Sequence, residues 1–189
     1  MRPIAIVALF VSVFALHAFV SAEEKAPSNV YDFTLDSIDG KAYALSQHKG
    51  EVLLLVNVAS QCGNTPQYAG LEKLYTDYHA KGLTVIGVPA NEFGAQEPGT
   101  NLEIKQFCTT KYKVSFPMMA KVVVKGEKIC PLYKYLTEDS PKKGAIGWNF
   151  AKFLVDRNGQ VIDRFEPGTK PEDAAIKKAI EKALEEKAK

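Results

Sequence analysis

Cys62 is the residue of this chain best placed for nucleophilic chemistry. It follows the apolar stretch Val52–Val58, which predicts a buried strand, and it precedes Pro66, a residue typical of the first turn of a helix. Amide N–H groups at the start of a helix stabilise a thiolate relative to a thiol. The residue three positions later is Thr65 rather than a second cysteine. The pattern therefore indicates a one-cysteine nucleophile whose oxidised form is resolved by another group.

Two further segments carry polar side chains suited to that chemistry. Leu83–Val88 predicts a second buried strand, and the loop 91–99, with the sequence NEFGAQEPG, follows it. Loops beyond the carboxyl ends of parallel strands meet at one rim of an α/β sheet, so this loop is expected beside Cys62. Gln96 in the loop carries an amide, and the pair Trp148–Asn149 brings an indole and a second amide.

The elements that must hold these residues follow an α/β pattern. Residues 31–36 and 41–45 alternate around Asp39–Gly40, and residues 150–155 and 160–165 flank Asn158–Gly159, so both pairs predict β-hairpins. Val122–Val124 predicts a third strand. The order of elements favours an α/β, thioredoxin-like fold, in which helices flank a central mixed sheet and an N-terminal β-hairpin precedes it.

Helices are predicted where apolar residues recur at helical spacing. They span Pro66 to Gly82, Asn101 to about Lys111, residues 131–137, and a last segment with an apolar stripe from Ile176 to Leu184. In the second helix, the expected inward positions are Leu102, Ile104, Phe107 and Cys108. Residues 169–172 resemble a capping box that begins the last helix at Thr169.

Residues 1–22 differ from the rest of the chain. Arg2 is their only charge, residues 4–20 are apolar, and Val20-Ser21-Ala22 resembles a small-residue cleavage site. These features predict a secretory signal peptide at 1–22 and a mature domain at 23–189 that is exported to a periplasm, an organelle lumen or the exterior. An uncleaved N-terminal anchor is the alternative.

Composition narrows the function further. The chain has 189 residues, of which 46% are hydrophobic and 24% charged, which suits one globular domain. Lysines and acidic residues interleave and the formal charge is +2, so no nucleic-acid partner is indicated. The cysteines (Cys62, Cys108 and Cys130) are odd in number and, with the scattered histidines, match no zinc spacing. We therefore expect neither a disulfide scaffold nor a metal or other cofactor.

Three motifs, taken together and in order, resemble the signatures of the glutathione peroxidase family. They are NVASQCGNT at 57–65, NEFGAQEP at 91–98 and WNF at 148–150, and the resemblance runs from about residue 30 to residue 180. It implies that the chain reduces hydroperoxides. Cys62 would be the peroxidatic residue, where some relatives carry selenocysteine, and Gln96, Trp148 and Asn149 would complete a catalytic tetrad.

Hydroperoxide reduction needs hydrogen-bond donors as well as an acidic thiol. A thiolate attacks one oxygen while the other departs with negative charge, which N–H groups of Gln96, Trp148 and Asn149 would stabilise as an oxyanion hole does. Lowering a thiol pKa from about 8.5 to about 6 raises the thiolate fraction at pH 7 roughly 30-fold. Nucleophilicity falls on the order of 13-fold over the same change, so most of the acceleration must come from the donors and from positioning.

Cys108 has two interpretations. It is either a small buried hydrophobe or a resolving cysteine that attacks the sulfenic acid on Cys62 and leaves a disulfide. We favour the second, because the context IKQFCTTKY at 104–112 resembles the cysteine-using, thioredoxin-dependent branch of the family. A disulfide needs Cα atoms within about 7 Å, and Thr109 and Thr110 are weak helix formers that ease opening of the helix. Cys130 lies outside the catalytic pattern and is interpreted as a structural thiol.

The resemblance also bears on partners. Tetrameric, glutathione-using members carry an extra loop before the Trp-Asn motif, whereas residues 125–147 here form a short segment with few arginines. This resembles the monomeric branch, which accepts bulky lipid hydroperoxides, so the expected reductant is a thioredoxin-like dithiol or glutathione. Two other hypotheses remain: a peroxide sensor that passes oxidation to a partner protein, and a thiol–disulfide exchange protein, against which Thr65 argues.

Overall fold

The computed structural model describes residues 26–188 of the chain. The predicted signal peptide at 1–22 lies outside the described residues. Within 26–188, no helix combines the length and the apolar character that crossing a bilayer requires.

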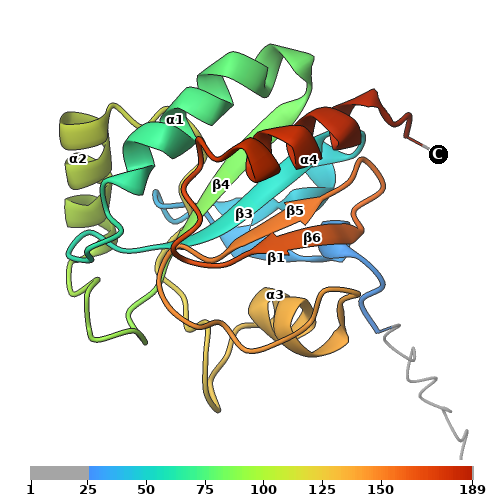
Figure 1. The fold of residues 1–189 in the computed structure, drawn as a ribbon. Coiled ribbons are helices and arrows are strands. Elements are labelled where there is room, and N and C mark those ends of the chain that lie inside the picture. Colours follow the sequence, from blue (N-terminus) through green and yellow to red (C-terminus); the bar gives the residue numbers. More distant parts are fainter. Residues whose placement is uncertain (1–25, 189) are drawn as a thin grey trace, which may run out of the picture.

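Four strands form a central mixed sheet in the spatial order β4–β3–β5–β6 (Figure 1): β3 (Val52–Val58), β4 (Leu83–Pro89), β5 (Lys152–Val155) and β6 (Val161–Phe165). β3 and β4 are parallel, whereas β5 runs antiparallel to both β3 and β6. Every residue of β3 and β4 is buried, because both faces of the sheet are covered. β1 (Thr34–Asp36) and β2 (Ala42–Ala44) pair as a separate antiparallel hairpin, as predicted.

Helices on the two faces of the sheet enclose two apolar cores. α1 (Gln67–Tyr78), α2 (Asn101–Tyr112) and α4 (Ala174–Glu185) contribute to one core, and the short α3 (Pro131–Lys134) and the N-terminal hairpin contribute to the other. Figure 1 shows α1 and α4 on one side of the sheet and α3 on the opposite side. This arrangement confirms the predicted thioredoxin-like α/β fold with its mixed sheet and N-terminal hairpin.

The predicted third strand at Val122–Val124 is wrong. The outer edge of β4 is bonded instead by residues 117–119, which precede the predicted strand. Met119 N donates to Gly87 O (2.8 Å), and Gly87 N donates to Pro117 O (3.0 Å). Because those bonds already use the backbone of β4, residues 122–124 pass beyond the end of the strand. Only Val122 N reaches β4, at the carbonyl of Pro89 (3.1 Å).

Two local helix predictions are also wrong. Leu102 is 64% exposed. Ile104 and Cys108 define the buried face of α2, and a residue two positions before Ile104 lies about 200° away around the helix. The cap of α4 is Asp173, whose carboxylate accepts a hydrogen bond from Ala175 N (2.9 Å), and not Thr169.

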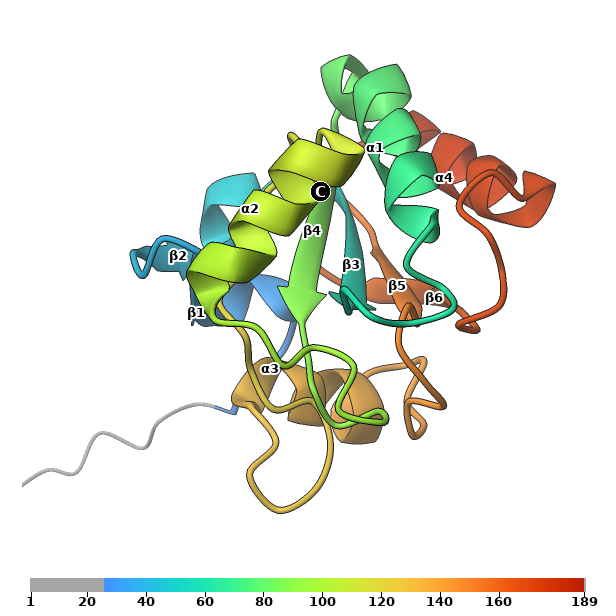
Figure 2. The same cartoon turned by 90° about the vertical axis from the view of Figure 1, so that its left-hand side faces the viewer.

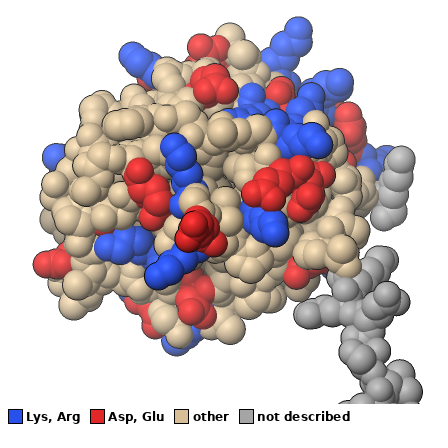
Figure 3. All heavy atoms as spheres, turned by 90° about the horizontal axis from the view of Figure 1, so that it is seen from below, with Lys and Arg blue, Asp and Glu red and all other residues tan. Residues whose placement is uncertain are grey.

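Charged side chains of both signs are spread over the face that carries α3, and neither sign dominates it (Figure 3). The whole chain has a similar balance, with 24 Lys and Arg against 22 Asp and Glu. The electrostatic field of this face therefore does not favour a partner of one charge.

Candidate active site

Cys62 lies in the turn between β3 and α1, where the backbone holds its sulfur in place. Its side chain is mostly buried, and Asn64 N donates a hydrogen bond to Sγ (3.3 Å). Thr65 occupies the position where a dithiol enzyme has its second cysteine. Its Oγ1 accepts from Cys62 N (2.9 Å) and donates to Ala59 O (2.9 Å). The turn is thus fixed at both ends, and one amide N–H points at the sulfur, where it favours negative charge.

The loop that follows β4 meets this turn, as the rim argument predicted. Figure 2 shows the two loops together below the carboxyl ends of β3 and β4. Gln61 N donates to Gln96 O (3.0 Å), which joins the loops directly. Ala95 has a φ of +53°, in the left-handed region that non-glycine residues rarely adopt. Such strained residues cluster at functional sites, and this one immediately precedes Gln96.

Asn149 connects the Cys62 turn with Gln96. It is fully buried; its Nδ2 donates to Gln96 Oε1 (3.0 Å) and to Phe93 O (3.4 Å). Its backbone carbonyl accepts from Asn64 Nδ2 (3.4 Å). The sequence predicts Asn149 as a donor to the departing oxygen. In this structure its N–H groups orient Gln96 instead, so that the Nε2 end of Gln96 points away from Asn149.

Trp148 forms the open side of the site. It is 41% exposed and its ring packs on Phe93, with ring centroids 5.8 Å apart. A Cβ atom added at Gly94 would lie 3.6 Å from both Gln96 Cγ and Trp148 Cη2, so these two side chains flank the same glycine. The structure therefore brings Gln96, Asn149 and the Cys62 turn into one hydrogen-bonded network and places Trp148 against its edge.

Two asparagines of the first motif take part in the site, and the sequence analysis did not single them out. Asn64 bonds both the sulfur and Asn149, as described above. Asn57, fully buried at the end of β3, donates from Nδ2 to Trp148 O (3.2 Å), and its carbonyl accepts from Phe150 N (2.6 Å). Phe150 has a φ of +72°, so a second left-handed residue flanks the site. Asn57 could have been noticed as a polar residue within an otherwise apolar strand, whereas Asn64 contacts the sulfur through its backbone N–H, which no side-chain pattern signals.

Cys108 lies in a very different environment. It is 1% exposed on α2, and burial raises its pKa to about 11, with the Glu97 carboxylate adding to the rise and the Tyr68 hydroxyl beside it acting in the opposite direction. Only on the order of 1 thiol in 10,000 would be ionised there at pH 7. Cys62, Cys108 and Cys130 are all free. Attack by Cys108 therefore requires that its surroundings change first.

A cleft separates the Cys62 turn from the helix that carries Cys108. Its volume is about 440 Å³, and it is lined by Ser60, Gln61, Glu97, Pro98, Gly99, Glu103, Ile104 and Phe107. Glu97, one of the lining residues, is fully buried, and burial raises the pKa of its carboxyl. The cleft thus lies between residues 60–61, which precede Cys62, and the side of α2 that carries Glu103, Ile104 and Phe107; neither Cys62 nor Cys108 lines it.

Cys130, the third cysteine, lies apart from the Cys62 network, on the α3 side of the sheet. Cys130 is half-buried, it immediately precedes α3, and burial raises the pKa of its thiol. It packs at the margin of the core on the α3 side of the sheet. Among the described residues, no group of three or more His, Cys, Asp or Glu side chains is arranged to hold a metal ion.

Fold and site together define a class of protein: a thioredoxin-like oxidoreductase with a single cysteine in the strand–turn–helix position, surrounded by amide side chains. The sequence model of the glutathione peroxidase family matches residues 30–137. The chain is 46% identical over 158 residues to a glutathione peroxidase of Lactococcus lactis subsp. cremoris, a match that covers 82% of this chain and 99% of that protein.

Two further relatives agree. The chain is 52% identical over 151 residues to hydroperoxy fatty acid reductase Gpx2 of Synechocystis sp., covering 80% of this chain and 96% of that protein. The crystal structure of GPX1 from T. cruzi superposes with a TM-score of 0.64 at 40% identity, covering 82% of this chain and 96% of that one. This chain belongs to the glutathione peroxidase family and is a thiol peroxidase.

Proposed function

We propose that Cys62 is the peroxidatic residue of this peroxidase, that Gln96 and Trp148 stabilise the oxygen that departs, and that Asn149 orients Gln96 for this role. The observation that carries the proposal is the hydrogen-bonded network from the Cys62 sulfur through Asn64 and Asn149 to Gln96. In the first step, the Cys62 thiolate attacks the terminal oxygen of ROOH and the O–O bond breaks. A sulfenic acid forms on Cys62, and the alkoxide takes up a proton to leave as ROH.

Cys108 is proposed to resolve the sulfenic acid. Its sulfur attacks Cys62 Sγ, the S–O bond breaks, and the thiol proton leaves with the hydroxyl as water. The intact α2 and the raised pKa of Cys108 imply that a local opening of the helix precedes this step. The product is an intramolecular disulfide, which consumes two electrons from an external thiol reductant when it is reduced again.

The proposed substrate and reductant are those that the resemblance to the monomeric, cysteine-using branch of the family implies. We propose that organic and lipid hydroperoxides as well as hydrogen peroxide are reduced, since the half-exposed Trp148 leaves the site open on one side. One curated relative is named as a hydroperoxy fatty acid reductase. The proposed reductant is a thioredoxin-like dithiol, with glutathione as the alternative, and the proposed functional unit is a monomer.

Export is a separate proposal that rests on residues 1–22 alone. Cleavage after Ala22 would release a domain that begins at Glu23. The mass of the protein recovered from an exporting host tests it: retention of residues 1–22 would contradict cleavage.

Two coupled assays on the 23–189 protein test the enzymatic proposal. One supplies thioredoxin, its reductase and NADPH, and the other supplies glutathione, its reductase and NADPH, with cumene hydroperoxide as substrate in both. We expect turnover with thioredoxin, and we expect Cys108→Ser to abolish that turnover. Cys130→Ser is the matched control and should be unaffected. Unchanged thioredoxin-coupled turnover in Cys108→Ser would refute the resolving role.

A further inference from the structure

Lys152 is a buried lysine that the peroxidase chemistry described above does not use. It is the first residue of β5, three positions after Asn149, and its side chain is fully buried. Lysine is almost never fully buried unless its ammonium is paired. Within residues 26–188, the ammonium forms no ion pair; its hydrogen bonds go to one side-chain amide and two carbonyls.

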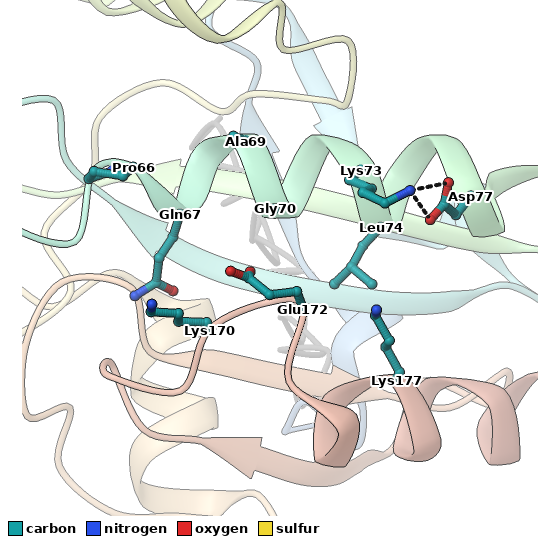
Figure 4. Close-up of a pocket in the computed structure, with 10 residues that line it drawn as sticks. All are labelled: Pro66, Gln67, Ala69, Gly70, Lys73, Leu74, Asp77, Lys170, Glu172 and Lys177. Carbon is teal, nitrogen blue, oxygen red and sulfur yellow. Dashed lines mark hydrogen bonds and ion pairs between the residues drawn. The ribbon is translucent and has the colours of Figure 1, made fainter.

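The three bonds of the ammonium join three separate segments. Nζ donates to Gln67 Oε1 (2.6 Å) at the first residue of α1, to Thr169 O (2.5 Å) and to Pro167 O (3.4 Å). Gln67 Nε2 also donates to Pro167 O (2.8 Å), so β5, the start of α1 and the 167–169 turn form one unit. Figure 4 shows the Gln67 side chain reaching from the first turn of α1 towards the segment that carries Lys170.

The segment that follows packs tightly on α1. A Cβ atom at Gly70 would lie 2.7 Å from Glu172 Oε2 and 3.1 Å from Pro171 Cβ. A pocket of about 430 Å³, drawn in Figure 4, lies between this segment and α1. The first turns of α1 are therefore held by Lys152, through Gln67, and by residues 171–172, which pack against Gly70.

A short path leads from this unit to the Cys62 sulfur. Gln67 N donates to Asn64 O (2.9 Å), and Asn64 N donates to Cys62 Sγ (3.3 Å). Asn64 Nδ2 donates to Asn149 O (3.4 Å), in the segment that leads into β5. Lys152 thus joins both ends of the network: it bonds Gln67 at the helix start that positions Asn64, and it begins the strand that follows Asn149 by three residues.

We propose that Lys152 is a positioning residue for the peroxidatic step: it holds Gln67, and through Gln67 the Asn64 peptide, against the Cys62 sulfur. The inference rests on the proposed function of Cys62. Stability alone does not explain a lysine here, since a buried ammonium is penalised by its desolvation and an apolar side chain of similar length would avoid that penalty. Burial lowers the pKa of Lys152 to about 8, which is the sign of that penalty.

The test compares two reactions of the same thiol in Lys152→Met, which keeps the length of the side chain and removes its donors. The first is oxidation of Cys62 by cumene hydroperoxide, followed through the fluorescence of Trp148, the only tryptophan. The second is alkylation of Cys62 by iodoacetamide, which has no departing oxygen to stabilise. We expect hydroperoxide oxidation to slow about tenfold or more, while alkylation changes less than about threefold.

Lys170→Met is the matched control, because it removes the same charge from an exposed lysine beside the same pocket; it should react like wild type. If Lys152→Met does not fold, Gln67→Met tests the same contact from the other side and should also slow hydroperoxide oxidation selectively. Gln67→Glu keeps an acceptor for the Lys152 ammonium, so it should oxidise with cumene hydroperoxide at close to the wild-type rate, unlike Gln67→Met.

Three outcomes would overturn the proposal. One is wild-type hydroperoxide oxidation in both Lys152→Met and Gln67→Met, and another is an equal loss of oxidation and alkylation, which would mark a purely structural role. The third is an additive loss in the Lys152→Met/Gln67→Met double variant, since residues acting through one contact should not add. Failure of the proposed function is distinct from all three, because wild type itself would then leave cumene hydroperoxide unreduced.

Discussion

Cys62 lies in a turn whose backbone donates a hydrogen bond to its sulfur, whereas Cys108 lies within α2 among apolar and aromatic side chains. Burial raises the pKa of Cys108 to about 11. The first environment supports a sulfur that reacts as the structure stands. The second keeps a sulfur protonated until the helix opens. The comparison teaches that the two half-reactions need two different conformations, so their rates should respond to different substitutions.

The largest effect should separate the two cysteines outright. Cys62→Ser should reduce consumption of hydroperoxide more than about 1,000-fold, because the nucleophile itself is gone. Cys108→Ser should leave the first oxidation within about twofold of wild type and stop at a sulfenic acid on Cys62. Dimedone trapping followed by mass spectrometry reads out both results. Loss of the first oxidation in Cys108→Ser would mean that the two sites are not independent.

Asn149→Ala should affect only the Cys62 half of the comparison. It removes the bond that orients Gln96, and we expect the rate of Cys62 oxidation to fall about 100-fold, as for loss of one oxyanion-hole donor. Stopped-flow fluorescence measures this rate. Gln106→Ala, which removes an exposed amide from α2, is the control and should be silent. A loss of rate below about threefold would show that Asn149 does not contribute to the oxidation of Cys62.

The pH dependence of disulfide formation tests whether ionisation of the buried Cys108 thiol controls this step. The folded pKa of Cys108, about 11, lies above its ordinary value of 9.0, so burial of this thiol stabilises the closed helix below pH 9. That stabilisation is lost as the pH rises towards 11. Because ionisation of the exposed thiol then favours the opened helix, the rate of disulfide formation should keep rising with pH up to about pH 11.

Acid-quenched mass spectrometry from about pH 6 to about pH 10.5 would record this profile. Its rise between about pH 7 and about pH 10.5 should be on the order of 10-fold or more. A rate that stayed level across this range would show that ionisation of Cys108 does not control disulfide formation, and the contrast between the two thiols would then not explain the second half-reaction.

The smallest effect concerns the stability of α2 itself. Thr109 is exposed, and its hydroxyl donates to the carbonyl of Lys105. Thr109→Ala should favour the helix by about 0.5 kcal/mol and slow disulfide formation about twofold, without changing the first oxidation. Thr76→Ala is the matched control, because Thr76 makes the same kind of bond to Glu72 O (3.1 Å) on α1. Equal slowing in both variants would argue against local opening of α2.

Periodicity in the sequence predicted the elements that hold the site. The run Val52–Val58, apolar except for Asn57, identified β3, and the pair Asn158–Gly159 located the turn between β5 and β6. The three motifs identified Cys62, Gln96, Trp148 and Asn149 as neighbours. These features are local in the chain or carried by residue type, and for that reason they could be found without coordinates.

Contacts between distant segments could not be predicted in this way. The run Val122–Val124 has strand-forming residues, but the edge of β4 is already taken by the segment before it. Thr169 resembled a helix cap, but its carbonyl accepts from buried Lys152 and α4 begins later. Asn64 acts on the sulfur through its backbone N–H, a group that every residue but proline carries. Sequence patterns report on side chains, and these outcomes depend on where the backbone lies.

Thr65 has a consequence for engineering a dithiol enzyme on this fold. Its hydroxyl accepts from one side of the turn and donates to the other, and a thiol is a poor substitute in both roles. A cysteine at position 65 would create a Cys-x-x-Cys redox pair with Cys62. It would also weaken the bonds that hold the turn in which the Asn64 amide points at the Cys62 sulfur. Conversion of the peroxidase into a dithiol exchange enzyme therefore requires a compensating change in the turn. Thr65→Cys alone should give an enzyme that is poor at both reactions.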